Sequence, residues 1–182
     1  MPGPERRASI LVAAAEAFAV LGYAATSMDE VADRAGVSKV LLYRHVASKD
    51  ELYRSVLEGA LEEMALEFDA RQGAGEVHGP IRAVLTVARR NPHGVRLLVR
   101  HASREADFDD YAAELRQRVI DGITPLLEPA ATDPAHLRWV VELAVTVVWE
   151  GVLAWLDHGT GDDEEFIARL GGGVEAALAA WL

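Results

Sequence analysis

The segment TSMDEVADRAGVSKVLLYRHVASKDELYR, residues 26–54, decides the fold of this chain. Its first part, Met28–Arg34, repeats apolar residues at helical spacing. Ser27 with Glu30 three residues later is a capping box, which marks where that helix begins. Gly36 then allows a sharp reversal of the chain, because glycine adopts a positive φ at no steric cost. The pattern predicts a short helix followed by a tight turn.

A second short helix is expected after the turn. Ser38 can cap its start, and it continues through His45. Ala32 is small where the two helices must cross closely, and Val37 and Leu42 can fill the space between them. This arrangement predicts a helix-turn-helix, whose second helix lies in the major groove of DNA.

Longer helices are expected on both sides of this motif. An apolar face predicts one helix over Glu5–Leu21, and Ser48 with Glu51 forms a second capping box that opens another. With these flanks the chain resembles the TetR family of bacterial regulators over Arg6–Leu57. The matching stretches are AFAVLGYAATSMDEVA at 17–32, AGVS at 35–38 and LYRHVASKDELY at 42–53.

The resemblance implies an all-α protein with two parts. Residues 1–47 would form a three-helix helix-turn-helix DNA-binding domain, and residues 48–182 a helical domain that binds an effector and dimerises. It further implies a repressor that binds a near-palindromic operator in double-stranded DNA as a homodimer. A small-molecule effector would release it, and no cofactor is expected. It does not extend to a shared operator, because Lys39-Val40-Leu41 occupies the part of the motif that differs between such regulators.

The charge is unevenly distributed along the chain. The net charge is −11, yet residues 1–56 hold seven basic and seven acidic residues, and residues 57–182 hold eleven and twenty-two. The acidity therefore lies in the C-terminal part and does not exclude a DNA partner. It predicts weak non-specific binding and strong sensitivity to salt.

Cysteine usage and hydropathy indicate the compartment. The chain has no cysteine, which excludes disulfides and thiolate metal sites. No signal peptide pattern opens it, and the apolar run Trp139–Trp149 is interrupted by Glu142 and followed by Glu150. We expect a soluble, cytoplasmic protein without a membrane partner.

Only helices are expected beyond Ser48. The glycine run Gly171–Gly173 can serve close helix approach at a dimer interface or separate two shorter helices. The expected helices span about 48–70, 80–90, 95–103, 108–127, 133–157 and 162–182, the last interrupted by that run.

The last two helices predict self-association. Trp139–Leu156 is apolar almost all round, so such a helix is covered on more than one side. Two helices from each subunit would form a four-helix bundle across a two-fold axis. The alternative is a fully buried core helix in a monomer.

The second helix of the motif and its flanks carry the candidate DNA contacts. Lys39 can reach guanine O6 and N7, Val40 can meet a thymine methyl, and Arg44 can read a base or bind a phosphate. The family resemblance makes Tyr43, His45 and Lys49 phosphate contacts. The helix starts at Ser27 and Ser48 would add anion-binding N–H groups. Ser38, which caps the second helix, completes the candidate set.

Each assignment has a structural alternative. Tyr43 can be a core aromatic residue with its hydroxyl at the surface, and His45 can stabilise the C-terminus of its helix. Lys49 can be an ordinary solvated residue. These alternatives remain open from the sequence.

An effector pocket implied by the resemblance would be apolar and aromatic. Each candidate can equally be a core or interface residue. Arg96, Arg100 and Arg104 form a basic stripe that either binds an anionic ligand or is a solvated face paired with acids. The pocket candidates are Leu97, Leu98, His101, Tyr111, Leu115, Trp139, Leu143 and Trp149.

Two other classes of function compete with a DNA-binding regulator. The chain has no P-loop, no G-x-S-x-G, no H-E-x-x-H and no dinucleotide fingerprint, and its histidines show no metal-ligand spacing. We therefore do not expect an enzyme. The third hypothesis is a helical interaction module in which the motif serves only for packing. Such a protein would show no salt-dependent DNA binding.

Overall fold

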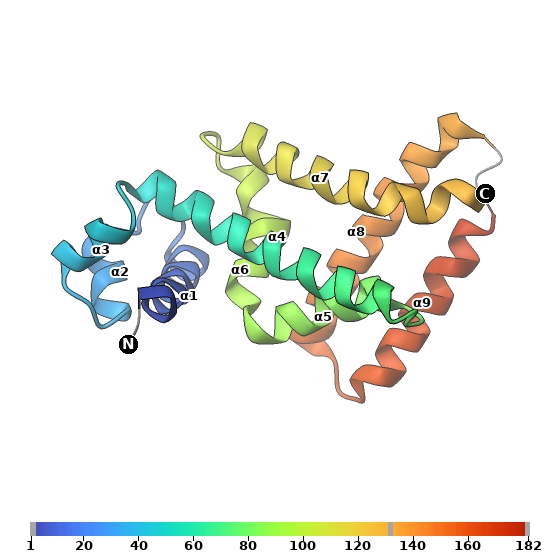
Figure 1. Cartoon of the computed structure of the whole chain (residues 1–182), viewed down its shortest axis with the longest axis horizontal. Coiled ribbons are helices and arrows are strands. Elements are labelled where there is room, and N and C mark those ends of the chain that lie inside the picture. Colours follow the sequence, from blue (N-terminus) through green and yellow to red (C-terminus); the bar gives the residue numbers. More distant parts are fainter. Residues whose placement is uncertain (1–2, 131–132, 181–182) are drawn as a thin grey trace. The chain divides into compact units, whose positions relative to one another are not determined.

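Helices form every regular element in residues 3–130 and 133–180, the part of the chain that this computed structural model describes (Figure 1). The expected all-α fold is confirmed, with most helix ends within a few residues of their predicted positions. In chain order the helices are α1 (Gly3–Leu21), α2 (Met28–Arg34), α3 (Lys39–His45), α4 (Lys49–Gly73), α5 (Gly79–Arg90), α6 (Pro92–Arg96), α7 (Asp109–Leu127), α8 (Pro134–His158) and α9 (Asp163–Leu178).

Internal contacts divide the chain into two units. The first comprises Met1–Glu63 and Arg90–Asp109, and the second comprises Met64–Arg89 and Asp110–Leu182. The division falls inside α4, so that helix contributes to both units. The first unit contains more of the chain than residues 1–47, where the sequence places the DNA-binding domain.

Local capping produces the helix-turn-helix as the sequence predicts. The Ser27 and Ser38 hydroxyl oxygens each accept a backbone N–H three residues further on, at 3.1 and 3.2 Å. Gly36 adopts φ +65° in the turn. The capping box at Ser27 is only half formed, because the Glu30 carboxylate pairs with Arg34 at 2.8 Å.

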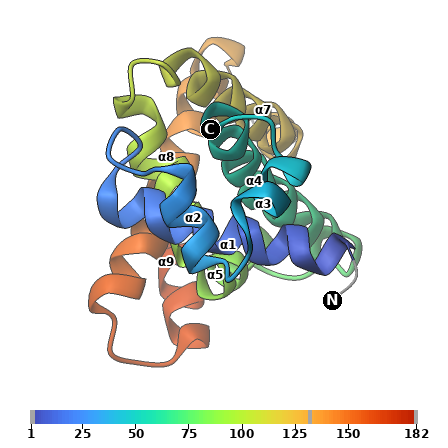
Figure 2. The same cartoon turned by 90° about the vertical axis from the view of Figure 1, so that its left-hand side faces the viewer.

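The core of the first unit fixes these short helices. α2 packs against both α1 and α3 (Figure 2). Ile10 and Phe18 from α1, Val31 from α2 and Leu42 from α3 are all fully buried. Helices of seven residues are unstable alone, so this shared core holds them in place.

The third predicted helix after Ser48 differs from the expectation. It begins at Pro92 rather than Val95, with the Asn91 side chain accepting the Gly94 N–H at 3.0 Å. After α6 the backbone changes to a π-helical turn, Leu97–His101, and then to a 3-10 turn, Ala102–Arg104. π-helical turns are uncommon and recur at functional sites, and side-chain periodicity gives no sign of them.

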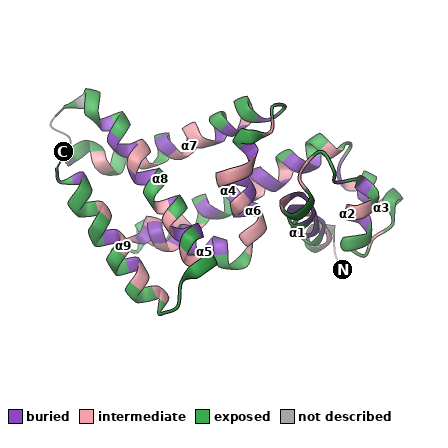
Figure 3. Ribbon diagram, turned by 180° about the vertical axis from the view of Figure 1, so that it is seen from behind, coloured by how far each residue is buried: buried purple, intermediate pink, exposed green. Residues whose placement is uncertain are grey.

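The second unit contains the long C-terminal helices. α8 and α9 pack against each other, and Val140, Ala144 and Leu178 form a cluster with Leu127 and Val174 beside it. Much of the surface of α9 is exposed (Figure 3).

The expected interruption of the last helix is wrong, because α9 continues through the three glycines. Gly171 is buried, and a Cβ there would overlap the imidazole of His78, whose Nε2 lies 3.0 Å from the Glu175 carboxylate. Gly172 and Gly173 have open space around them. The run therefore accommodates a histidine within the subunit.

One helix in the described residues, Ala135–His158, is long and apolar enough to cross a membrane by length and composition alone. Only 39% of its most apolar window is buried within the chain. Core helices of soluble proteins satisfy the same criterion, and the burial of Val140, Val141 and Val152 is that of a core helix.

Candidate nucleic-acid interface

α3 separates its residues into a buried anchor and an exposed reading surface. Leu42 is fully buried, as predicted, whereas Val40 is 68% exposed and Tyr43 is 46% exposed. Lys39 and Arg44 are also exposed, and His45 is half-buried. The outward residues are thus those that the sequence predicts for DNA contact, and the open alternative of Tyr43 as a core residue does not fit its exposure.

Lys39 has a partner that the sequence reading missed. Its ammonium lies 2.7 Å from one carboxylate oxygen of Asp29 and 3.0 Å from the other. The hydrogen bond from the ammonium to Asp29 raises the pKa of Lys39. Asp29 opens α2 and Lys39 opens α3, so the pair joins the starts of both helices.

Arg44 and Arg34 differ in whether their charge is available to bind an external anion. Arg34 makes salt bridges to Glu16 and Glu30 at 2.9 and 2.8 Å, so its charge is already compensated. Arg44 is exposed on α3 and makes no salt bridge among the residues that the structure describes. Arg44 is therefore well placed for an external anion.

Lys49 holds the loop that precedes α2. Its ammonium donates to the carbonyls of Tyr23, Ala24 and Thr26 at 2.9, 3.4 and 3.1 Å and lies 4.3 Å from the centre of the Tyr23 ring. We call this arrangement the Lys49 clasp. An ammonium has three N–H donors, and the clasp occupies all three. A phosphate contact by Lys49 remains a prediction, and it would require one of these bonds to be exchanged.

The two capping serines, Ser27 and Ser38, each still have a hydroxyl hydrogen that can be donated to a ligand. Each hydroxyl oxygen of Ser27 and Ser38 already accepts a backbone N–H. The hydroxyl hydrogen is still available, because a serine hydroxyl donates once and accepts twice. Both side chains are exposed, so both can donate to a phosphate oxygen.

An aromatic cluster behind the motif also escaped the sequence reading. Tyr23 and Tyr53 contact each other and also Phe18 and Phe108, with ring centres 4.5–5.9 Å apart. Tyr23 donates a hydrogen bond to Asp50, and burial followed by that bond raises the pKa of Tyr23. The buried Tyr53 hydroxyl has no hydrogen-bond partner among the residues that the structure describes, and burial raises the pKa of Tyr53. The cluster ties α1 to the start of α4 through side chains more than 25 residues apart.

The predicted effector residues fall in both units. Leu97, Leu98 and His101 belong to the first unit, whereas Tyr111, Leu115, Trp139, Leu143 and Trp149 belong to the second.

The environments of these residues differ. Leu97, Leu98, Leu115 and Trp149 are buried, and Trp139 is almost half exposed. Burial and then the neighbouring Arg104, opposed in part by Glu105, lower the pKa of His101. The basic stripe thus acts on a histidine of its own segment.

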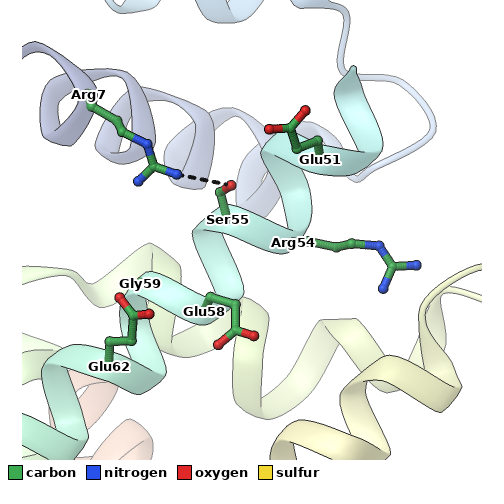
Figure 4. A pocket seen from close by; sticks show the side chains of 7 residues that line it. All are labelled: Arg7, Glu51, Arg54, Ser55, Glu58, Gly59 and Glu62. Carbon is green, nitrogen blue, oxygen red and sulfur yellow. Dashed lines mark hydrogen bonds between the residues drawn. The ribbon is translucent and has the colours of Figure 1, made fainter. Parts of the chain in front are cut away.

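A surface pocket of about 360 Å³ lies along α4 in the first unit (Figure 4). Its lining is mainly charged, which does not match the apolar effector pocket expected from the sequence. Arg7 donates a long hydrogen bond, 3.4 Å, to Ser55 within it. No cluster suited to a metal ion occurs among the described residues. The lining residues are Arg7, Glu51, Arg54, Ser55, Glu58, Gly59 and Glu62.

Sequence comparisons agree with this geometry in the first third of the chain. Residues 10–56 match the family model "Bacterial regulatory proteins, tetR family". The transcriptional activator FasR of Mycolicibacterium smegmatis is 57% identical over 58 residues, which cover 32% of this chain and 26% of FasR. The transcriptional repressor KstR2 of Mycobacterium tuberculosis is 42% identical over 57 residues, 31% of this chain and 28% of KstR2. The similarity thus spans about a quarter of each relative.

Solved structures extend the likeness of fold to nearly the whole chain. A transcriptional regulator of Aquifex aeolicus superposes with a TM-score of 0.76 at 20% identity, covering 94% of this chain and 99% of that one. AibR, solved with isovaleryl coenzyme A and operator DNA, gives 0.68 at 17% identity, covering 92% and 96%. These identities establish the fold alone.

The matched residues 10–56 contain the capped α2 and α3 and the exposed reading surface described above. Regulators of this family bind operator DNA and small-molecule effectors, and the family is not enzymatic, as the absence of catalytic motifs predicts. Through residues 10–56 the chain matches the TetR family of bacterial regulatory proteins, and nearly all of it has the fold of solved transcriptional regulators.

Proposed function

We propose that this regulator is a cytoplasmic repressor that binds a near-palindromic operator as a homodimer and leaves it when a small effector binds. Residues 1–47 read the DNA, and residues 48–182 hold the effector and the second subunit. The observation that carries the proposal is the surface of α3, where Lys39, Val40 and Arg44 all point outward beside the buried Leu42.

The DNA contacts divide by chemistry. Lys39 and Val40 lie at the start of α3, the part of a recognition helix that meets base edges. Tyr43, Arg44 and His45 follow on its later turns and can donate to phosphates, which position the protein without reading sequence. The Lys49 clasp acts by ordering the loop before α2. Two such heads would occupy half-sites about 34–36 Å apart or a multiple of that spacing.

The dimer rests on α8 and α9. Trp139 and Val147 expose apolar surface on α8, a helix of which 39% of the most apolar window is buried within one chain. Exposed apolar surface of this extent favours a protein partner. A second copy of the same two helices would cover it and form a four-helix bundle.

The effector would bind within residues 48–182. AibR, whose fold this chain shares, was solved with isovaleryl coenzyme A, an acyl thioester. An apolar effector suits the leucines and tryptophans of the second unit, Leu115, Leu143 and Trp149. Binding must favour the DNA-incompetent state by about 1–3 kcal/mol to give typical allosteric coupling.

Selection of bound sequences from a random duplex pool, at about 0.15 M salt, tests the proposal. An enriched inverted repeat is the expected result. A protein that enriches nothing, both as purified and after denaturation and refolding to remove ligand, is not an operator-binding protein. Reporter expression from the recovered site then separates repression, as by KstR2, from activation, as by FasR.

Variants separate the two kinds of contact. Tyr43→Phe and Arg44→Ala should weaken binding to every sequence similarly and reduce its salt dependence. Lys39→Ala should relax discrimination at one base position by about 1–3 kcal/mol. Arg169→Ala, which removes an exposed charge from α9, serves as the control and should change neither property.

A further inference from the structure

We propose that Asp29 and Lys39 together read one G·C base pair in each half-site. The inference rests on the operator binding proposed above and adds a carboxylate that determines specificity. Asp29 and Lys39 are called the reading pair below.

The reading pair lies at the level where base edges are met. Lys39 is the first residue of α3, and the N-terminal residues of a recognition helix contact bases. Asp29, in the first turn of α2, holds its carboxylate 2.7–3.0 Å from the Lys39 ammonium. Both side chains are exposed, so a donor and an acceptor are presented next to each other.

Neither protein stability nor phosphate binding accounts for the pair. An exposed lysine–carboxylate bridge contributes little to folding, because water and salt screen it. A carboxylate beside the ammonium also cancels the charge that would attract a phosphate. The cancelled charge does not weaken binding to a base pair whose edge presents a donor next to an acceptor. There the ammonium and the carboxylate can each form a hydrogen bond.

A G·C pair offers the complementary arrangement in the major groove. Guanine presents the acceptors O6 and N7, and cytosine presents the N4 amino donor. O6 and N4 are bonded to each other across the base pair, so they lie about 2.9 Å apart. That spacing matches the 2.7–3.0 Å between the Lys39 ammonium and the Asp29 oxygens. Lys39 would donate to guanine while Asp29 accepts from cytosine N4.

The arrangement also distinguishes the other base pairs. An A·T pair leaves the ammonium one acceptor in place of the two on guanine. A C·G pair places the guanine oxygen opposite the carboxylate and the cytosine amino group opposite the ammonium, so both contacts become repulsive. Asp29 therefore rejects wrong pairs as well as binding the right one.

The test uses the full-length protein and the operator recovered by selection. Each base pair of one half-site is changed in turn, and the dissociation constant is measured for wild type and Asp29→Ala. For wild type, replacing the G·C pair by C·G should weaken binding between about 5-fold and 150-fold. For Asp29→Ala this discrimination should fall at that position alone, while binding to random duplex DNA becomes tighter because a negative charge is lost.

Asp33→Ala is the matched control, since it removes an exposed carboxylate from the same helix. It should tighten binding to random DNA without changing discrimination, and thermal melting confirms that both variants fold. If Asp29→Ala keeps wild-type discrimination at every position, or if the sensitive position holds A·T, the inference is wrong although operator binding stands. If wild type enriches no inverted repeat, both proposals fail.

Discussion

The helix-turn-helix and the C-terminal helices both expose apolar side chains, but in different surroundings. On α3, Val40 and Tyr43 stand beside Lys39 and Arg44, within a unit whose short helices are fixed by caps and a buried leucine. On α8, Trp139 and Val147 lie on a long helix that is apolar on most sides. Exposed apolar surface among cations suits DNA, and the same surface on an apolar helix suits a protein.

The largest expected effect separates the anchor of α3 from its reading surface. Leu42→Ala should lower the free energy of unfolding by about 2–5 kcal/mol, because Leu42 is fully buried. Val40→Ala should leave stability nearly unchanged and alter only DNA binding. Denaturant unfolding of both variants measures the difference. Equal effects would mean that α3 is packed on both faces and has no free reading surface.

The next effect tests whether α8 is a protein interface. Val147→Asp places a charge at a site 39% exposed in one chain, so the subunit should fold but its self-association should weaken by at least about 2 kcal/mol. Leu126→Asp on α7, 37% exposed, is the matched control and should stay dimeric. Sedimentation equilibrium distinguishes them. If the wild type is monomeric, or if both Val147→Asp and Leu126→Asp remain dimeric, α8 is not part of a dimer interface.

The Lys49 clasp distinguishes structural from DNA-facing lysines within the first unit. Lys49→Met should lower stability by about 1–3 kcal/mol, because charged hydrogen bonds to three carbonyls are lost. Lys39→Met removes only an exposed pair and should change the melting temperature little. Calorimetric melting without DNA is the measurement. An unchanged melting temperature for Lys49→Met would mean that the Lys49 clasp does not stabilise the fold, and it would favour the predicted phosphate contact of Lys49.

Two neighbouring glycines of α9 should respond in opposite directions. Gly172→Ala should stabilise the chain by about 0.5–1 kcal/mol, because alanine favours the helix and the space is open. Gly171→Ala should destabilise the chain, because its methyl group would displace the His78 ring from Glu175. Chemical denaturation compares them. Loss of dimer in Gly172→Ala would show that the open face meets the partner subunit.

The smallest effect is a pH dependence in the first unit. Burial and Arg104 lower the pKa of His101 below its ordinary value of 6.5. The unfolded chain then binds the proton more readily, so the contribution of His101 is complete above about pH 6.5 and decreases as the pH falls below it. His101→Gln should show a shallower loss of stability in that window. An unchanged slope would assign the acid sensitivity to other groups.

Sequence reading predicted what depends on neighbouring residues. Caps at Ser27, Ser38 and Ser48, the turn at Gly36 and the buried Leu42 are local consequences of residue type and spacing, and the structure contains each of them. The exposed members of the candidate site follow from the same helical periodicity.

What the sequence could not show depends on packing between distant segments. Asp29 and Lys39 are ten residues apart, and the Lys49 clasp spans more than twenty, so no periodicity connects them. Continuity of α9 through Gly171 depends on the His78 ring, which fills the space that a side chain would need. Effector residues are the hardest to predict, because apolar pocket and apolar core look alike in a sequence.

The unbroken α4 has a consequence for cooperativity. It runs from Lys49 to Gly73, and the two contact-defined units meet at Glu63 and Met64 inside it. Fraying there would expose the backbone donors and acceptors of two new helix ends, so neither unit can melt without disturbing the other. A single calorimetric transition is the result to expect from such a shared helix, and limited proteolysis should find no early cut between residues 60 and 66.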